Sequence, residues 1–155
     1  MSAQPSSEAT PASTDLGSTN TLDEQALVGS LLWLRGPELD SVRAMFNRDD
    51  LANPRHQVVL DLIDACIAAD IPTDPATALH VARTTGLVSG YRLGQLGTLL
   101  IELHGAIAHP RWAHIYATAV VEASTRRAIQ RSAQRLEQAA AAEDFTDALA
   151  TVTDQ

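Results

Sequence analysis

Residues 55–69 read RHQVVLDLIDACIAA, and this stretch decides the fold class. Its apolar side chains recur every three or four residues, which is the spacing of one face of an α-helix. They are Val59, Leu62, Ile63, Cys66 and Ile67. Asp61 and Asp64 fall on the other side of that helix, where solvent is expected. The stretch therefore predicts an amphipathic helix with one face in a core.

The segments on either side repeat the helical pattern. A capping-box sequence at 21–24 predicts the start of a helix, and a proline at the head of 37–46 fits the first turn of a short one. Asp74, followed by proline, predicts an N-cap, and Gly86 closes the helix that begins there. Spaced leucines predict another helix at 93–105. No stretch has the pattern of a strand, so we expect an all-α protein with a compact multi-helix head.

The longest helix is expected to open at His109 and Pro110 and to run to about residue 140, a length of about 45 Å. Acidic residues followed by an apolar run predict a final short helix at 143–152 that turns back on the long one. The sequence thus predicts a long antiparallel helical hairpin at 109–155. Before it we expect a helical head at 22–108 and a disordered N-terminal tail at 1–21, which is rich in Ser, Thr, Ala and Pro.

The composition argues against catalysis. All eleven basic residues are arginine, so the chain has no lysine for a P-loop, a Schiff base or a general base. The glycine-rich run at 90–97 lacks the dinucleotide spacing, and no predicted strand precedes it. The one cysteine, Cys66, occupies an apolar helical position and is expected in the core. We therefore expect a protein that is not an enzyme and that uses no cofactor.

Five histidines raise the question of a metal site. His104, His109 and His114 are five residues apart, and on a helix this spacing rotates each by about 140° from the last. They cannot share one ligand face if they are helical. His56 opens a helix and is expected to have a structural or surface role rather than a catalytic one. The sequence therefore predicts no metal site and no catalytic residues.

The charge is uneven along the chain. The formal net charge of −8 opposes tight non-specific binding of nucleic acid. Residues 109–138 carry +3 and residues 139–155 carry −4, so the long helix is the one basic stretch. No apolar run approaches the roughly 18 residues that a membrane span requires, and 1–21 lacks the features of a signal peptide. We expect a cytoplasmic protein whose own nucleic-acid binding is weak or absent.

The long helix carries the candidate interaction surface. Its second half keeps only small or sparse apolar groups, with arginines at four-residue intervals on another face. Such a helix has too little core of its own, and dimerisation through the hairpin is the simplest way to bury its apolar side chains. The candidate self-association or partner interface consists of Trp112, Tyr116, Ala119, Ala123, Arg127, Arg131 and Arg135. For the arginines, a solvated face, a partner-binding face and a nucleic-acid-binding face all stay open.

Several segments carry a resemblance to a known family. Residues 24–32, EQALVGSLL, are similar to its first-helix pattern, and Asp49-Asp50-Leu51 with His56 is similar to its Asp-Asp-Phe-Tyr segment and following histidine. Residues 71–74 resemble the segment in which an aspartate caps the next helix. Residues 116–127 match the start of its long hairpin helix. In this order and spacing the chain resembles the N-terminal domain of DnaB-type replicative helicases.

The resemblance covers 23–152 and departs from the family at three points. Leu51-Ala52 replaces an aromatic pair, Leu99 replaces a tyrosine, and the proline before the hairpin is shifted to Pro110. In full-length relatives this domain implies a head and hairpin that pair into a collar, which steadies the helicase hexamer and receives primase. The linker and RecA-like ATPase domain of those relatives have no counterpart in these residues.

Three functions follow from these observations. We favour a non-catalytic oligomerisation and partner-binding module connected with DNA replication, forming a dimer or a trimer of dimers and binding a replicative helicase or primase. A second interpretation is the non-catalytic portion of an ATP-dependent DNA helicase whose motor domain is missing or on another chain. A third is a helical DNA-binding regulator that uses the arginines of the hairpin.

Overall fold

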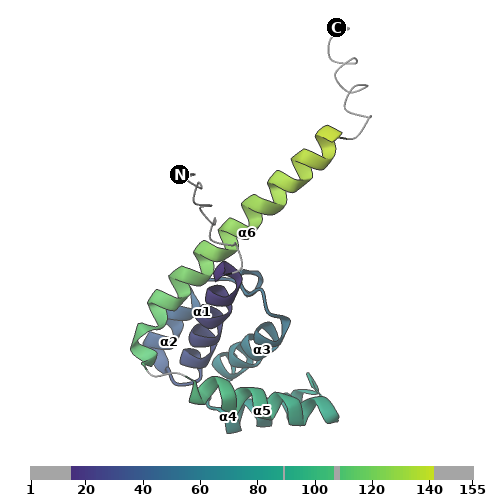
Figure 1. Cartoon of the computed structure of the whole chain (residues 1–155). Coiled ribbons are helices and arrows are strands. Elements are labelled where there is room, and N and C mark those ends of the chain that lie inside the picture. Colours follow the sequence, from purple (N-terminus) through teal and green to yellow (C-terminus); the bar gives the residue numbers. More distant parts are fainter. Residues whose placement is uncertain (1–14, 89, 107–108, 142–155) are drawn as a thin grey trace, which may run out of the picture.

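Every regular element in the computed structural model is helical over the part of the chain that it describes, residues 15–88, 90–106 and 109–141 (Figure 1). In chain order the elements are α1 (Asp15–Leu31), α2 (Gly36–Arg43), the 3₁₀ turn η1 (Arg48–Asp50), α3 (Pro54–Ala68), α4 (Pro75–Thr85), α5 (Tyr91–Gly105), the 3₁₀ turn η2 (Pro110–Trp112) and α6 (Ala113–Ala141). The expected all-α fold is confirmed.

The core lies where α1, α3, α5 and the first half of α6 meet. Helix α3 buries the apolar face that its sequence predicts, including Leu62 and Ile63, and it also buries Cys66. Burial raises the pKa of the Cys66 thiol, as expected for a residue of the core. The largest fully buried side chains are mostly aliphatic, in keeping with the low aromatic content of the sequence.

Both ends of α4 are built as the sequence predicts. The Asp74 carboxylate accepts hydrogen bonds from the backbone amides of Ala76 and Thr77, each at 3.1 Å, so it caps the start of the helix. Gly86 follows the last turn with a φ of +70°, the left-handed conformation that glycine adopts without a steric cost. These two predictions are confirmed.

A polar contact fixes the end of α1. The fully buried Thr73 hydroxyl donates to the Leu31 carbonyl at 2.8 Å and accepts from Arg35 Nη1 at 3.0 Å. The last carbonyls of a helix have no partner within it, and a hydroxyl donor supplies one here. The segment that leads into α4 is thereby tied to the end of α1.

The expected start of α1 is wrong. The helix begins at Asp15, so 15–21 are helical rather than part of a disordered tail, and Thr21 lies inside the helix instead of at its N-cap. The physical reason is that Glu24 does not reach back to Thr21, because its carboxylate bonds to the backbone of a distant loop. Residues 1–14 of the expected tail lie outside the described residues.

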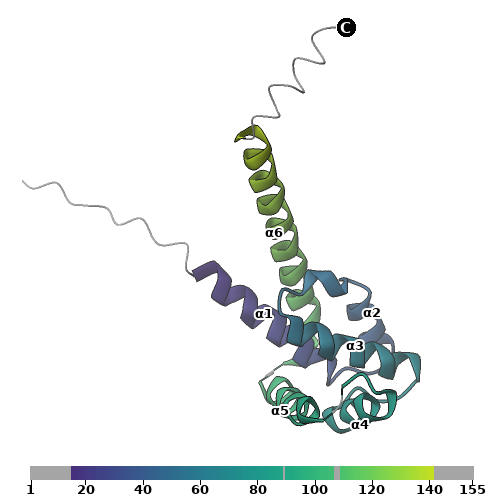
Figure 2. The same cartoon turned by 90° about the vertical axis from the view of Figure 1, so that its right-hand side faces the viewer.

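Helix α6 has a packed half and a projecting half. Its first half lies against α1 and buries Ala113, Ala117 and Val120. All side chains from 128 to 141 are exposed, and this half stands clear of the head (Figure 2). The predicted extent to about residue 140 is confirmed, although the helix opens with a 3₁₀ turn. The returning arm of the hairpin, expected at 143–152, lies outside the described residues.

Helices α4 and α5 lie together at the end of the head farthest from the free end of α6 (Figures 1 and 2). They approach closely at Gly97, where an added Cβ atom would be 3.5 Å from Leu79 Cδ2.

Within the described ranges, no helix combines the length and the hydropathy that crossing a membrane requires.

Candidate interaction surface

The projecting half of α6 exposes two large apolar side chains. Ile129 is 65% exposed and Leu136 is 72% exposed. Together with Ala133 and Ala140 they are spaced four, three and four residues apart, which places all four on one side of the helix. This alternating spacing is the one by which paired helices pack. We call these four residues the projecting face of α6, and they form the candidate interaction surface.

The predicted interface residues in the first half of α6 lie at the junction with the head. Trp112, in η2, is partly exposed, and the Arg111 guanidinium lies 5.9 Å from the centre of its ring. Tyr116 packs against the core, and Ala119 and Ala123 are half-buried. The participation of these residues in an interface stays a prediction.

The three predicted arginines do not act alike. Arg127 Nη2 donates to the Asp50 carbonyl of the head, and its Nη1 is buried with no hydrogen-bond partner among the described residues. Arg131 Nε donates to the Arg127 carbonyl at 3.3 Å, while the Arg131 and Arg135 side chains are exposed. Arg127 therefore joins α6 to the head, whereas the exposed Arg131 and Arg135 side chains are accessible to a partner.

The acceptor for Arg127 belongs to a loop, residues 47–53, that is itself held from two sides. The Asn47 backbone amide donates to the Asp50 carboxylate at 2.7 Å. From α1, Glu24 Oε1 accepts from the Ala52 amide at 2.6 Å and Glu24 Oε2 accepts from the Asn53 amide at 3.1 Å. A buried carboxylate that accepts two backbone amides fixes the loop relative to α1. The position of α6 on the head therefore depends on Glu24 as well as on apolar packing.

The ionisation of Glu24 reflects these contacts. Burial by itself would raise the pKa of the Glu24 carboxyl, but the hydrogen bonds from His56, Ala52 and Asn53 outweigh it and hold the pKa below its ordinary value. Glu24 is therefore a buried anion whose partners are all within the chain. This contact assigns His56 a structural role, in agreement with the sequence interpretation.

Two further arginines of the head are paired. Arg43 forms a two-pronged contact with Asp64 at 2.6 and 2.8 Å, and Arg48 does the same with Asp61 at 2.8 and 3.1 Å. Both aspartates lie on the solvent side of α3 as predicted, with side chains 42% and 38% exposed, and each is paired with an arginine. These pairs tie α2 and η1 to α3.

The described residues contain no group of three or more His, Cys, Asp and Glu side chains that is suited to hold a metal ion. His104 stacks on Trp33 with ring centres 3.9 Å apart, and Trp33 Nε1 donates to the His104 carbonyl at 2.9 Å. His104 thus joins α5 to the end of α1.

Two features of the surface were not predicted from the sequence. Ile129 and Leu136 are not among the interface residues predicted from the sequence, although their seven-residue separation is a signal for helix pairing. The hydrogen bond between Arg127 and Asp50 had no signal in the sequence, because the two residues are 77 positions apart.

The structure consists of a helical head and a projecting helix that exposes an apolar face. Solved structures show the same fold. The chain has the fold of the N-terminal domain of a DnaB helicase. The crystal structure of that domain from Mycobacterium tuberculosis matches with a TM-score of 0.69 and 25% sequence identity, over 87% of this chain and 96% of that one. The resemblance inferred from the sequence is confirmed. No protein-family model and no curated protein matches the sequence.

Proposed function

We propose that this chain is a non-catalytic self-association and partner-binding module connected with DNA replication. The observation that carries the proposal is the exposure of Ile129 and Leu136 on a half-helix that stands clear of the head. A helix that packs against no core is only marginally stable in water. Burying the large apolar side chains on it lowers the free energy. A second copy of the chain has the same face, so the simplest way to bury these side chains is a contact between two copies.

The charges along the sequence support an antiparallel arrangement of two such copies. Residues 109–138 carry +3 and residues 139–155 carry −4. In an antiparallel pair the basic stretch of one copy lies near the acidic stretch of the other, whereas a parallel pair sets like charges side by side. Arg131 and Arg135 belong to this basic stretch, and they lie on the side of α6 away from the projecting face.

The partner that we propose beyond the second copy is a replicative helicase, with primase as the other candidate. This part rests on the shared fold with the N-terminal domain of DnaB helicase and on the role that the family resemblance implies. The exposed Trp112 and the half-buried Tyr116, at the junction of head and helix, extend the apolar surface available to such a partner.

Size-exclusion chromatography with light scattering tests both parts. The chain is run alone, then mixed with the host's replicative helicase, and then separately with primase. We expect a dimer or larger assembly alone and co-elution with one of the two proteins. A chain that stays monomeric at high micromolar concentration contradicts self-association. A chain that elutes separately from both proteins contradicts the partner proposal and leaves self-association standing.

A further inference from the structure

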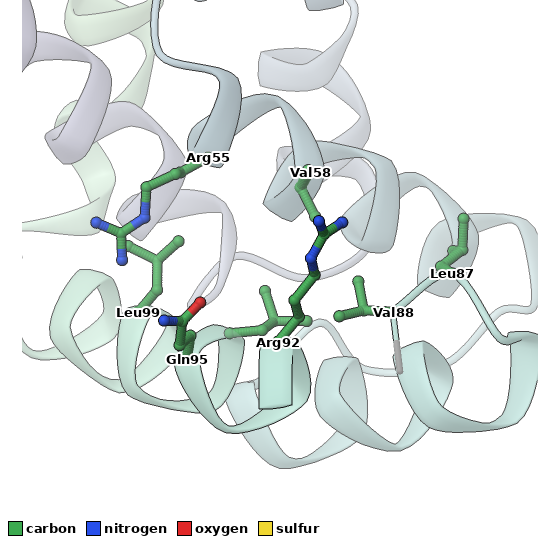
Figure 3. Close-up of a pocket in the computed structure, with 8 residues that line it drawn as sticks. Arg55, Val58, Leu87, Val88, Arg92, Gln95 and Leu99 are labelled. Atoms are coloured by element: carbon green, nitrogen blue, oxygen red, sulfur yellow. The ribbon is translucent and has the colours of Figure 1, made fainter. Parts of the chain in front are cut away.

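A groove lies in the head between α3 and α5 (Figure 3). It has a volume of about 690 Å³, which is within the range of pockets that bind ligands. Its apolar lining consists of Val58, Leu87, Val88, Leu96 and Leu99, and its polar lining consists of Arg55, Arg92 and Gln95. Val58 and Leu87 are exposed although they are large and apolar. The groove thus presents apolar contact area together with two cations.

The two arginines face into this groove from opposite helices. The Arg55 side chain extends from α3 and the Arg92 side chain from α5, so that both guanidinium groups lie between the two helices (Figure 3). None of the eight lining residues is acidic. Unlike Arg43 and Arg48, which form ion pairs, neither Arg55 nor Arg92 has an ion pair or side-chain hydrogen bond among the described residues.

Helix stability does not explain these arginines. Arg55 follows Pro54 at the start of α3, and Arg92 follows Tyr91 at the start of α5. The positive end of the helix dipole lies at the N-terminus, so a cation in the first turn is unfavourable and an acidic residue is favoured. Neither helix has an acidic residue in its first turn. The groove is therefore a locally electropositive site in a chain whose formal net charge is −8.

We propose that this groove binds an acidic amphipathic helix of a partner protein. Leucine-like side chains of that helix, spaced three or four residues apart, fill the apolar lining, and its Asp or Glu residues pair with Arg55 and Arg92. Helices commonly dock by such spaced apolar anchors, and a guanidinium binds a carboxylate through two parallel hydrogen bonds. The groove is at the end of the head away from the projecting face of α6, so the proposal does not rest on self-association.

The test uses two dye-labelled designed peptides and the full chain. Both peptides are helical and carry leucine at positions i, i+4 and i+7; one has glutamate at the flanking positions and the other has lysine there. Fluorescence anisotropy measures binding, and amide chemical shifts of the labelled chain locate it. We expect the glutamate peptide to bind at least about tenfold more tightly than the lysine peptide, with shifts at Val58, Leu96 and Leu99.

Charge-reversal variants complete the test. Arg55→Glu and Arg92→Glu each place an acidic residue in the first turn of a helix, which the helix dipole favours, so both are expected to fold. Arg83→Glu on α4 makes the same charge change outside the groove. We expect about a tenfold loss of glutamate-peptide binding in the first two variants and little loss in the third.

Three results would overturn the proposal: equal binding of the two peptides, equal effects of the three variants, or shifts that map outside the groove. An unlabelled single-stranded oligonucleotide is added as a competitor. If the oligonucleotide displaces the glutamate peptide and binds the groove more tightly than the peptide does, the groove is a nucleic-acid-binding site and not a site for an acidic helix.

Discussion

Glu24 Oε2 of α1 lies 3.2 Å from His56 Nδ1 of α3, and the two residues are only 1% and 4% exposed. The same carboxylate accepts the backbone amides of Ala52 and Asn53, which immediately precede α3. One buried anion therefore joins the first helix, the 47–53 loop and the start of the third. Through the Asp50 carbonyl, that loop also receives Arg127 of α6.

Glu24→Gln is expected to destabilise the fold. Glutamine keeps the size of the side chain but removes its charge. It also replaces one acceptor oxygen with an NH₂ donor, and this donor faces either a backbone amide or the His56 ring. Hydrogen bonds to a charged group contribute about 1.5–3 kcal/mol, so we expect a loss of about 2 kcal/mol in the free energy of unfolding. Urea denaturation measures it. Glu102→Gln, at an exposed position of α5, is the control and should change stability by less than about 0.5 kcal/mol. Equal effects of the two variants would contradict the role of Glu24.

The lowered pKa of Glu24 predicts a dependence of stability on acid. The ordinary carboxyl value is 4.5, and the folded chain holds this group below it. The unfolded chain therefore takes up the proton first as the pH falls, and acid favours unfolding. The contribution of Glu24 is fully present above pH 4.5 and is lost as the pH falls through the lowered value of the folded state. The difference in unfolding free energy between wild type and Glu24→Gln should shrink over this range. A difference that stays constant or grows toward acid pH would show that the charge of Glu24 is not the stabilising feature.

Two glycine substitutions should have opposite effects. Gly86→Ala forces a Cβ atom into a left-handed position with a φ of +70°, at a cost of about 1–2 kcal/mol. Gly94→Ala lies within α5, with nothing within 4 Å of the added Cβ atom, and should stabilise by up to about 1 kcal/mol. Thermal unfolding of both variants checks the signs. If Gly86→Ala proves neutral, the left-handed end of α4 is not needed for stability.

Local features of this fold were predictable from the sequence because local rules determine them. The periodicity of 55–69 predicts α3 to within a residue at each end, and Asp74 and Gly86 mark the ends of α4. In each case the structure forms through contacts within a few residues. The resemblance to the DnaB N-terminal domain was also predictable, since it depends on the order and spacing of such segments.

Features that depend on distant contacts were not predictable. Thr21 and Glu24 satisfy the capping-box pattern, yet the Glu24 carboxylate bonds to Ala52 and Asn53, 28 and 29 positions away. The capping-box prediction failed because the contact with the distant loop satisfies two backbone amides, those of Ala52 and Asn53, whereas the capping box would satisfy one. Arg55 and Arg92 share a groove for the same reason, since only the packing of α3 and α5 against α1 and α4 brings them together.

Self-association through the projecting face of α6 is tested with a double variant. Ile129→Glu with Leu136→Glu removes both exposed apolar side chains and keeps residues that favour a helix. Ile101→Glu on α5, where the side chain is 68% exposed, is the matched control. Light scattering after size exclusion gives the mass of each. We predict that wild type and Ile101→Glu assemble and that the double variant is a monomer whose head stays folded. A double variant that assembles as wild type does would contradict the claim.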